Sequence, residues 1–310
     1  MRIVYFGTPQ FAVPALERLL EARHTVTLVV TQPDRPKGRG QQLAASPVKQ
    51  CALRHGLELF QPERIRRPEC VERLRREEAD AMVVVGYGQI IPQSIIDLPR
   101  HGIINVHGSL LPKYRGAAPI QWAVAKGERV TGVTTMRIDA GLDTGDMLLK
   151  AETEIGPEEN AIELGDRLAR MGAGLLVRTL EGLEAGTVTP EPQDHAAHTL
   201  APILKKEDGL IDWAWPAQRI HDLARGFQPW PGAYTRFRGQ TLHLWKSRPA
   251  GDAVPQARLS KIGRRLVAGC GLDTALELLE VQMEGKKRMP AEVFANGQRI
   301  AEDEVLGGSC

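Results

Sequence analysis

The sequence predicts an α/β protein with a doubly wound, mostly parallel, Rossmann-like sheet, followed by a small β-barrel. Three observations predict this fold. Short apolar segments alternate with helical periodicity through the first half of the chain. Residues 81–85 are apolar almost throughout, as expected of a parallel strand buried on both faces. Beyond about residue 190 the pattern changes to short strands separated by Gly, Pro and polar turns.

Composition describes an ordinary globular protein. The chain has 310 residues, enough for two domains that each bury a core, with 42% hydrophobic and 25% charged residues. The formal charge of +2 is too small to indicate a partner. The four cysteines have no zinc-binding spacing, which predicts free thiols in a reducing compartment. Neither a signal peptide nor an apolar run of about 20 residues is present, so we expect a cytoplasmic location.

The first half alternates between strands and helices. The expected strands are residues 2–6, 25–30, 57–60, 81–85, 103–107 and 131–138. The expected helices are residues 11–22, 47–55, 69–78, 117–126 and about 160–183, the last long enough to pack across the whole sheet. Such alternation favours a parallel sheet with helical crossovers.

The second half begins with a polar, Pro-bearing linker. It spans residues 190–205 and separates an expected domain of residues 1–189 from one of residues 206–310. A helix near 216–226 is followed by expected strands at residues 233–238, 241–246, 257–262, 265–268, 275–282 and 289–295. Clustered basic residues are consistent with a phosphate-facing stripe, or with a solvated barrel surface: Lys246, Arg248, Arg258, Lys261, Arg264, Arg265, Lys286, Lys287 and Arg288.

The turn after the first strand does not match a dinucleotide site. It reads Gly7-Thr8-Pro9-Gln10 rather than G-x-G-x-x-G, and its proline removes a backbone N–H that would bind phosphate. No acidic residue ends the second strand, where Thr31-Gln32-Pro33 stands. These departures argue against an NAD-dependent dehydrogenase. The fold alone assigns no function.

A basic segment follows the second strand. In residues 31–50, Arg35, Lys37 and Arg39 alternate with Pro and Gly, a pattern typical of a mobile, non-helical surface loop. The simplest interpretation is a solvated connection. However, its length and its position at the ligand-binding edge of the sheet favour a functional lid or clamp. Backbone phosphates of RNA would suit cations presented in this way.

The strand at residues 103–107 carries the strongest candidate site. Asn105 and His107 are two residues apart and therefore share one face. Gly108 and Ser109 end the strand, so the pair lies near its carboxyl end, where open α/β sheets bind ligands. An amide can donate to a carbonyl oxygen and an imidazole can move a proton. The alternative is two polar residues that hydrogen-bond to their own loop.

A second candidate group is a Gly-rich acidic loop. Residues 139–146 contain three carboxylates, Asp139, Asp143 and Asp146. The loop lacks the spacing and terminal Glu of an EF-hand, so we expect no metal there. Instead, one carboxylate is expected to orient His107 and to favour its charged form. Spacing alone does not choose among the three.

Together these motifs resemble the folate-dependent formyltransferase family. The resemblance rests on Asn105, His107, Ser109-Leu110-Leu111-Pro112 and Gly141-Leu142-Asp143-Thr144-Gly145. More narrowly, the chain is similar to the members of this family that formylate methionyl initiator tRNA, through residues 6–9, 32–40, 46–49, 107–120, 211–213 and 227–231. The similarity covers nearly the whole chain. Gln228 is a departure, because the family usually has Asn there.

The resemblance implies site residues. Asn105, His107 and Asp143 match the catalytic trio, which selects Asp143 from the three acidic candidates. Arg39 matches an arginine that reaches the acceptor end of tRNA, and Lys37 and Arg35 on the same loop are expected to contact the RNA. The residues that match the formyl-folate segment are Ser109, Leu110, Leu111 and Pro112.

The resemblance also implies an activity and partners. The expected donor is 10-formyltetrahydrofolate, and the expected acceptor is the free amino group of methionyl initiator tRNA, giving N-formylmethionyl-tRNA for translation initiation. It implies an OB-like barrel that binds tRNA. We expect no metal, no membrane association and a monomer.

Two other function classes are alternatives for such a sequence. The first is a related formyl-folate enzyme that uses water or a sugar nucleotide as acceptor; the basic loop and second domain argue against it, because a small acceptor needs no phosphate clamp. The second is a noncatalytic RNA-binding protein on the same fold. Retention of Asn105, His107 and Asp143 argues against that class.

Overall fold

The computed structural model describes residues 1–37, 42–300 and 304–307. The chain divides into two compact units, each composed of several segments. The first unit comprises Met1–Gly116, Val130–Glu154 and Gly165–Ala201. The second unit comprises Ala117–Arg129, Ile155–Leu164 and Pro202–Cys310. The expected division at residues 1–189, 190–205 and 206–310 remains a prediction.

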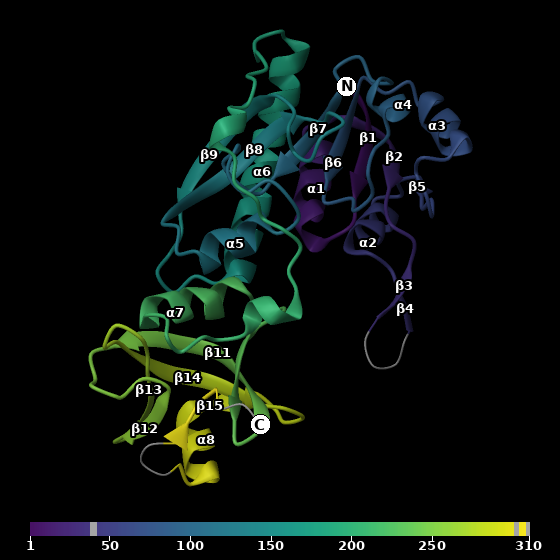
Figure 1. Ribbon diagram of the computed structural model, residues 1–310. Coiled ribbons are helices and arrows are strands. Elements are labelled where there is room, and N and C mark those ends of the chain that lie inside the picture. The colour runs from purple at the N-terminus through teal and green to yellow at the C-terminus, as the bar shows by residue number, and fades with distance from the viewer. Residues whose placement is uncertain (38–41, 301–303, 308–310) are drawn as a thin grey trace. The chain divides into compact units, whose positions relative to one another are not determined.

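The first unit is built on a mostly parallel sheet with the strand order β5-β2-β1-β6-β7-β8-β9. The first five strands in that order are parallel, β8 runs antiparallel to β7, and β9 runs antiparallel to β8. The strand bounds are β1 (Arg2–Gly7), β2 (Thr25–Val30), β5 (Leu59–Phe60), β6 (Ala81–Val85), β7 (Ile103–His107), β8 (Val130–Arg137) and β9 (Met147–Glu154). The predicted Rossmann-like sheet is confirmed, and Figure 1 shows it.

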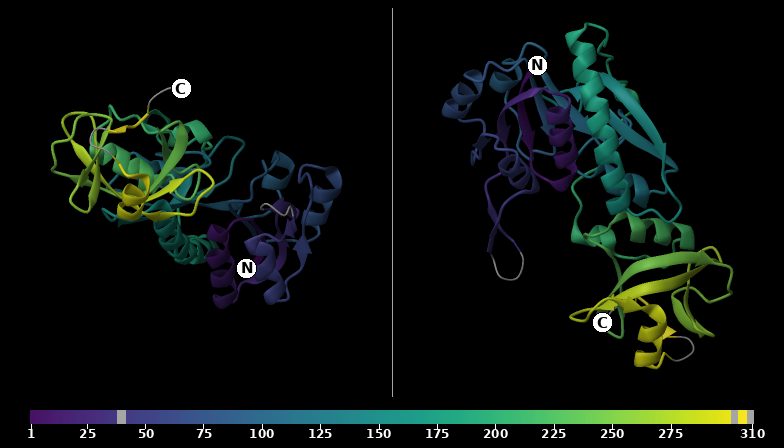
Figure 2. Two further views of the ribbon diagram at one scale, coloured as in Figure 1. Left: turned by 90° about the horizontal axis from the view of Figure 1, so that it is seen from below. Right: turned by 180° about the vertical axis from the view of Figure 1, so that it is seen from behind.

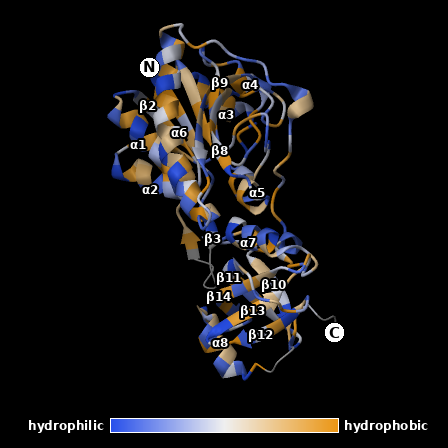
Figure 3. Cartoon of the chain, turned by 90° about the vertical axis from the view of Figure 1, so that its left-hand side faces the viewer, coloured by the Kyte–Doolittle hydropathy of each residue, from blue (hydrophilic) through white to orange (hydrophobic). Residues whose placement is uncertain are grey.

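Helices cover both faces of this sheet because side chains alternate along its strands. Ile3 and Tyr5 pack in a cluster with α1, α2 and α6, whereas Val4 and Phe6 pack with α3 and α4. The helix bounds are η1 (Gln10–Ala12), α1 (Val13–Glu21), α2 (Pro47–Arg54), α3 (Pro68–Arg75), α4 (Gln93–Ile96) and α6 (Ala161–Glu184). Figure 2 (right) shows α1 (purple) and the long α6 (teal) on the same side of the sheet. Figure 3 shows that each of these two helices carries both hydrophilic and hydrophobic residues.

The described part of the basic segment forms a hairpin. Strands β3 (Arg35–Lys37) and β4 (Gln42–Ala44) pair antiparallel. The segment is therefore non-helical, as predicted, but its two arms are hydrogen-bonded strands. Arg39 lies outside the described residues. Helix α2 follows directly, and the Ser46 hydroxyl caps it by accepting from the Lys49 N–H.

The second unit is an antiparallel barrel with the strand order β10-β11-β14-β13-β12-β16, and β15 adds to β14. A bridge between Phe237 and Leu306 links β10 to the residue after β16 and nearly closes the barrel, which removes most free strand edges. The strands are β10 (Ala233–Phe237), β11 (Gln240–Ala250), β12 (Arg258–Ile262), β13 (Arg265–Gly269), β14 (Ala275–Met283), β15 (Met289–Pro290) and β16 (Glu304–Val305). Helices α5 (Pro119–Ala125), η3 (Lys206–Gly209) and α7 (Ala217–Gly226) also belong to this unit.

The prediction of one barrel strand, at residues 289–295, is wrong. Residues 289–295 form only the short β15, and α8 (Ala291–Gln298) then begins. Ala291, Phe294 and Ala295 are buried at helical spacing, so this apolar pattern belongs to a helix that packs on the barrel core. The short length of the segment hid that periodicity.

The described cysteines are buried free thiols: Cys51, Cys70 and Cys270. Burial raises the pKa of Cys270 to about 12, and burial also raises the pKa of Cys51 and Cys70. Because the thiolate is the reactive form, we expect slow alkylation of these residues in the native chain and rapid alkylation after unfolding. Iodoacetamide labelling followed by peptide mass spectrometry measures this; rapid labelling of native Cys270 would contradict it.

Among the residues with described coordinates, no helix is both long and apolar enough to cross a membrane.

Candidate active site at the end of strand β7

Strand β7 positions Asn105 and His107. Ile104 and Val106 pack in the cluster that includes α6, so the two polar side chains project from the opposite face. Both are nearly buried, with 8% and 6% of their surface exposed. On the neighbouring strand β8, Met136 and Thr134 lie opposite them. The expected common face is therefore present at the carboxyl end of a central strand.

The two ring nitrogens of His107 have different partners. Nε2 lies 2.9 Å from the carbonyl oxygen of Tyr114. A carbonyl oxygen only accepts, so Nε2 carries a hydrogen. Nδ1 lies 3.7 Å from Oδ2 of Asp143, which is close enough for an ion pair but too long for a direct hydrogen bond. Nδ1 is consequently the nitrogen that is available to gain or lose a proton.

The structure distinguishes Asp143 from Asp139 on the same loop. Its Oδ2 accepts from the backbone N–H of Gly116 at 2.8 Å as well as facing His107. By contrast, Asp139 turns back into its own loop and accepts from Gly141 and Thr144. Asp143 has a φ of 51°, a left-handed conformation that Asp tolerates better than most residues. Spacing left this choice open, and loop geometry favours the residue that the resemblance implied.

The position of Gly116 leaves no room for a side chain. Its φ is 120°, and a Cβ there would lie 2.7 Å from the carbonyl oxygen of Ala201. Only glycine fits this approach without strain. The close approach brings the Gly116 N–H to the carboxylate of Asp143.

The turn after β7 is anchored to β8. The Ser109 hydroxyl donates to the carbonyl of Lys113 at 2.6 Å. Thr134 Oγ1 donates to the Ser109 carbonyl at 2.8 Å and accepts from the Leu111 N–H at 3.1 Å. The Leu111 side chain packs with Met136 and Met147. The Ser109 hydroxyl and the Leu111 side chain thus shape the turn, and folate contacts by Ser109, Leu110, Leu111 and Pro112 remain a prediction.

The described basic side chains near the hairpin have acidic partners. Arg35 lies 3.2 Å from Glu63, with both groups exposed. Lys49 lies 2.6 Å from Asp34, and this bond contributes most to lowering the pKa of that carboxyl. The expected contacts of Arg35, Lys37 and Arg39 with tRNA remain predictions.

Part of the basic stripe expected on the barrel is neutralised. Four of its arginines lie within 2.9 Å of a carboxylate: Arg248 with Glu277, Arg264 with Glu292, Arg265 with Asp252, and Arg288 with Glu280. Lys261 donates to the side chain of Asn296. To bind a phosphate, each paired arginine must give up its carboxylate. For these four arginines, the pairing favours a solvated surface over a dedicated phosphate stripe.

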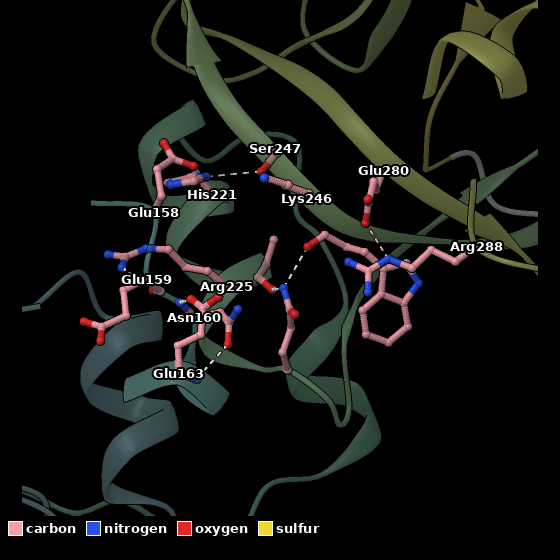
Figure 4. Close-up of a pocket in the computed structure, with 13 residues that line it drawn as sticks. Glu158, Glu159, Asn160, Glu163, His221, Arg225, Lys246, Ser247, Glu280 and Arg288 are labelled. Carbon is pink, nitrogen blue, oxygen red and sulfur yellow. Dashed lines mark hydrogen bonds and ion pairs between the residues drawn. The ribbon is translucent and has the colours of Figure 1, made fainter. Parts of the chain in front are cut away.

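A hollow of about 540 Å³ lies in the second unit, between the start of α6, helix α7 and strands β11 and β14. Figure 4 shows four glutamates along it: Glu158, Glu159, Glu163 and Glu280. Its arginines are engaged, Arg225 by Asp222 and by two backbone carbonyls, and Arg288 by Glu280. The carboxylates along the hollow outnumber its lysine and arginines. The charge of the hollow therefore does not favour binding of an anion.

A group with metal-ligand chemistry lies between α1 and α2. Single ligand atoms of Glu17, Cys51 and His55 fall within 4.8 Å of one another. However, the guanidinium of Arg54 lies 3.5 Å from the same carboxylate oxygen of Glu17 that faces Cys51. Burial also raises the pKa of Cys51, so the thiolate that a metal requires is disfavoured.

The family described as formyl transferase matches residues 1–180, and the family described as formyl transferase, C-terminal domain, matches residues 203–299. This chain belongs to the formyl transferase family. The resemblance inferred from the motifs is confirmed.

Full-length relatives of this family are closely similar to the chain. The methionyl-tRNA formyltransferase of Solibacter usitatus is 66% identical over 307 residues, covering 99% of both chains. The methionyl-tRNA formyltransferase of Koribacter versatilis is 58% identical over 308 residues, again covering 99% of each.

Solved structures of more distant formyl transferases and related proteins share the fold. WlaRD, a sugar 3N-formyl transferase, superposes with a TM-score of 0.68 at 17% identity, covering 93% of this chain and 99% of that one. HypX from Aquifex aeolicus, solved in complex with tetrahydrofolic acid, gives a TM-score of 0.65 at 17% identity, covering 98% of this chain and 48% of that one. At these identities the likeness establishes the fold alone.

The departure from the family pattern at Gln228 is accommodated inside the second unit. Its Nε2 donates to the carbonyl oxygens of Ala224, at 3.1 Å, and Trp245, at 2.7 Å. The side chain therefore links α7 to β11 from a nearly buried position. Such a structural contact lies within the barrel unit, whereas Asn105, His107 and Asp143 belong to the first unit.

Sequence reasoning missed three contributors to the site. Two are backbone groups, the Tyr114 carbonyl and the Gly116 N–H, which no side-chain motif can reveal. The third is Gln193, which lies in the segment interpreted as a linker and whose amide donates to the carbonyl oxygens of Asp143 and Gly145. No local pattern distinguishes it from a solvated glutamine.

Proposed function

We propose that this chain transfers the formyl group of 10-formyltetrahydrofolate to the free amino group of methionyl initiator tRNA, producing N-formylmethionyl-tRNA for translation initiation. The observation that carries the proposal is the 66% identity, over 99% of both chains, with a methionyl-tRNA formyltransferase. The facing imidazole and carboxylate of His107 and Asp143 support it, because acyl transfer to an amine needs groups that move protons.

Asn105 is proposed to stabilise developing charge. Attack by the amine on the formyl carbon places negative charge on the formyl oxygen. In the described part of the chain, no hydrogen-bond partner of the Asn105 side chain is found, although only 8% of the residue is exposed. Its amide N–H groups are thus free to donate to that oxygen, as preorganised donors do in oxyanion sites. An unpartnered amide at this strand end fits a carbonyl-bearing substrate such as a formyl-folate.

His107 and Asp143 are proposed to manage charge and protons. Because Nε2 is committed to Tyr114, a proton on Nδ1 gives a cation that can stabilise the same oxygen. The Asp143 carboxylate faces this nitrogen, with its Oδ2 3.7 Å from Nδ1. The attacking amine must also lose a proton, and Asp143 is the acceptor that we propose, directly or through water. The bond between the formyl carbon and N10 of the folate then breaks, and N10 takes up a proton as tetrahydrofolate leaves. A positioned acid or base contributes roughly 10²- to 10⁴-fold to such steps.

The substrates are proposed to contact further segments. Ser109, Leu110, Leu111 and Pro112 form the turn beside His107 and would hold the folate. The basic segment of residues 31–50, whose sequence contains Arg35, Lys37 and Arg39, would contact tRNA phosphates, and so would the barrel unit, whose paired arginines would exchange their carboxylates for phosphate. Such contacts predict binding that weakens with added salt. A chain that uses these substrates is expected to work in the cytoplasm, without a metal and as a monomer.

A single assay with alternative acceptors tests the function. The chain is mixed with 10-formyltetrahydrofolate and with methionyl initiator tRNA, free methionine, a sugar nucleotide with a free amine, or water alone. We expect formyl product only on the charged tRNA, detected by mass spectrometry of the released amino acid. Product on the sugar nucleotide or release as formate would indicate a related formyl-folate enzyme. Binding of tRNA without any formyl product would indicate a noncatalytic RNA-binding protein.

A further inference from the structure

A buried glutamine holds the backbone of the loop that carries Asp143. Gln193 is only 4% exposed. Its Nε2 donates to the carbonyl oxygens of Asp143 and Gly145, each at 2.8 Å. Both amide hydrogens are therefore used on the same loop. The main chain beside Gln193 is also fixed, because Glu191 and Met147 exchange two backbone hydrogen bonds of 2.8 Å.

A buried arginine determines how that glutamine is oriented. Arg115 is 4% exposed, and its Nε and Nη2 donate to Oε1 of Gln193 at 3.0 and 2.7 Å. A guanidinium has no acceptor, so the atom facing it must be the amide oxygen. The amide nitrogen is then forced toward the carbonyls of Asp143 and Gly145. The contacts with Arg115 therefore decide which end of the Gln193 amide is oxygen and which is nitrogen, a choice that the shape of the amide alone leaves open.

Arg115 also places the donor that holds the carboxylate. Its backbone N–H donates to the Thr199 carbonyl, and its own carbonyl accepts from the Ala201 N–H, at 2.9 and 2.7 Å. These bonds fix the residue immediately before Gly116, whose N–H donates to Oδ2 of Asp143. Asp143 is thus held at its backbone through Gln193 and at its carboxylate through Gly116.

Charge explains why a glutamine suits this position. On one side of the Gln193 amide lie the carbonyl oxygens of Asp143 and Gly145, which need donors. On its other side lies the Arg115 guanidinium, which needs an acceptor. A carboxylate would satisfy Arg115 but would present oxygen to oxygen on the Asp143 side. Within the described chain, the hydrogen-bond partners of the Arg115 side chain include no carboxylate, only Gln193 and His195.

We propose that Arg115 and Gln193 are positioning residues that hold the carboxylate of Asp143 against His107 Nδ1. The inference deepens the proposed function, because its kinetic consequence depends on Asp143 taking part in formyl transfer. Its structural consequence does not depend on the reaction: without the two donors of Gln193, the left-handed turn at Asp143 loses its restraint.

Gln193→Glu is the discriminating variant. It keeps the length of the side chain and the acceptor for Arg115, but it removes both donors to the loop. We expect kcat to fall by about 100-fold, as a displacement of roughly 1 Å does at a reacting group. The KM for charged tRNA is expected to stay close to that of the parent chain. The midpoint of thermal unfolding is expected to fall, because two buried carbonyl oxygens lose their donors. Gln240→Glu is the matched control, since this exposed glutamine on β11 undergoes the same change in charge.

A double-mutant cycle separates positioning from general stabilisation. If Gln193 acts through Asp143, then Gln193→Glu costs about 100-fold in the parent chain and little in an Asp143→Asn background, measured as single-turnover rates. Equal fold losses in both backgrounds would overturn the proposal, as would a loss that appears only in KM.

Hydrogen exchange provides a readout that needs no turnover. In Gln193→Glu, the amides of residues 139–146 and of Gly116 are expected to exchange faster, while the strands of the first sheet keep their protection. Unchanged exchange in this loop would overturn the proposal even if the variant lost activity. If the parent chain did not formylate tRNA, the proposed function would fail, and this measurement would still decide whether Gln193 restrains the loop.

Discussion

Replacing Asn105 with Ala, His107 with Ala or Asp143 with Asn is expected to reduce kcat by roughly 10²- to 10⁴-fold. In the proposed mechanism, the amide and the imidazole act on the charge that develops on the formyl oxygen, and the carboxylate acts on the proton that the amine loses. Because these interactions are made in the transition state, the KM for charged tRNA should change little. Steady-state kinetics with charged initiator tRNA, together with tRNA binding measured directly, checks both statements.

The same acidic loop offers the control for that experiment. Asp146→Asn removes one charge only three positions from Asp143 and has no contact with His107 among the described interactions. We expect it to retain most activity. A loss as large as that of Asp143→Asn, or a matching loss of tRNA affinity in the Asn105, His107 and Asp143 variants, would contradict the assigned roles.

The second large effect is expected on stability, at a buried ion pair of the second unit. Arg225 and Asp222 lie 2.8 Å apart on α7, with less than a tenth of either side chain exposed. Arg225 also donates to the carbonyls of Gly156 and Glu159. Asp222→Ala leaves the guanidinium buried without its counter-ion, and such losses typically cost about 3–5 kcal/mol. The unfolding transition of the barrel unit in urea measures this change.

Two further variants make the stability prediction specific. Glu292→Ala removes the partner of Arg264 from a more exposed pair and should shift the transition far less. The double variant Asp222→Leu with Arg225→Met removes both buried charges, so its loss should be smaller than the sum of the single losses. Equal shifts of the unfolding transition for Asp222→Ala and Glu292→Ala would contradict the prediction that the buried pair contributes more to stability than the exposed one.

Most elements of the first sheet could be predicted because their signals are local. The strands expected at residues 81–85 and 103–107 have these same bounds in the structure, because runs of apolar residues in the sequence mark them. Strand β9 was missed, since beyond its first residues it alternates exposed and half-buried side chains at the edge of the sheet. Helix α8 was mistaken for a strand because only its contacts with the barrel core reveal the helical face.

The candidate site could be predicted only in part. A shared face for Asn105 and His107 follows from a two-residue spacing on any strand. The choice of Asp143 among three carboxylates came from resemblance, and the bond from Gly116 supplies its physical reason. The role of Gln193 had no signal at all, because its partners, Arg115 and the carbonyls of Asp143 and Gly145, are remote in the chain.

By itself, the sequence determined the fold class, the family and the strand that bears the amide and imidazole. These depend on periodicity and on motifs whose residues are neighbours in the chain. Only the tertiary structure decided which nitrogen of His107 is free, which carboxylate faces it, and that Arg115 and Gln193 restrain the carboxylate's loop. Those relations join segments that meet only when the sheet pairs and the chain after α6 returns to it, and hydrogen bonds between remote residues leave no periodic pattern in a sequence.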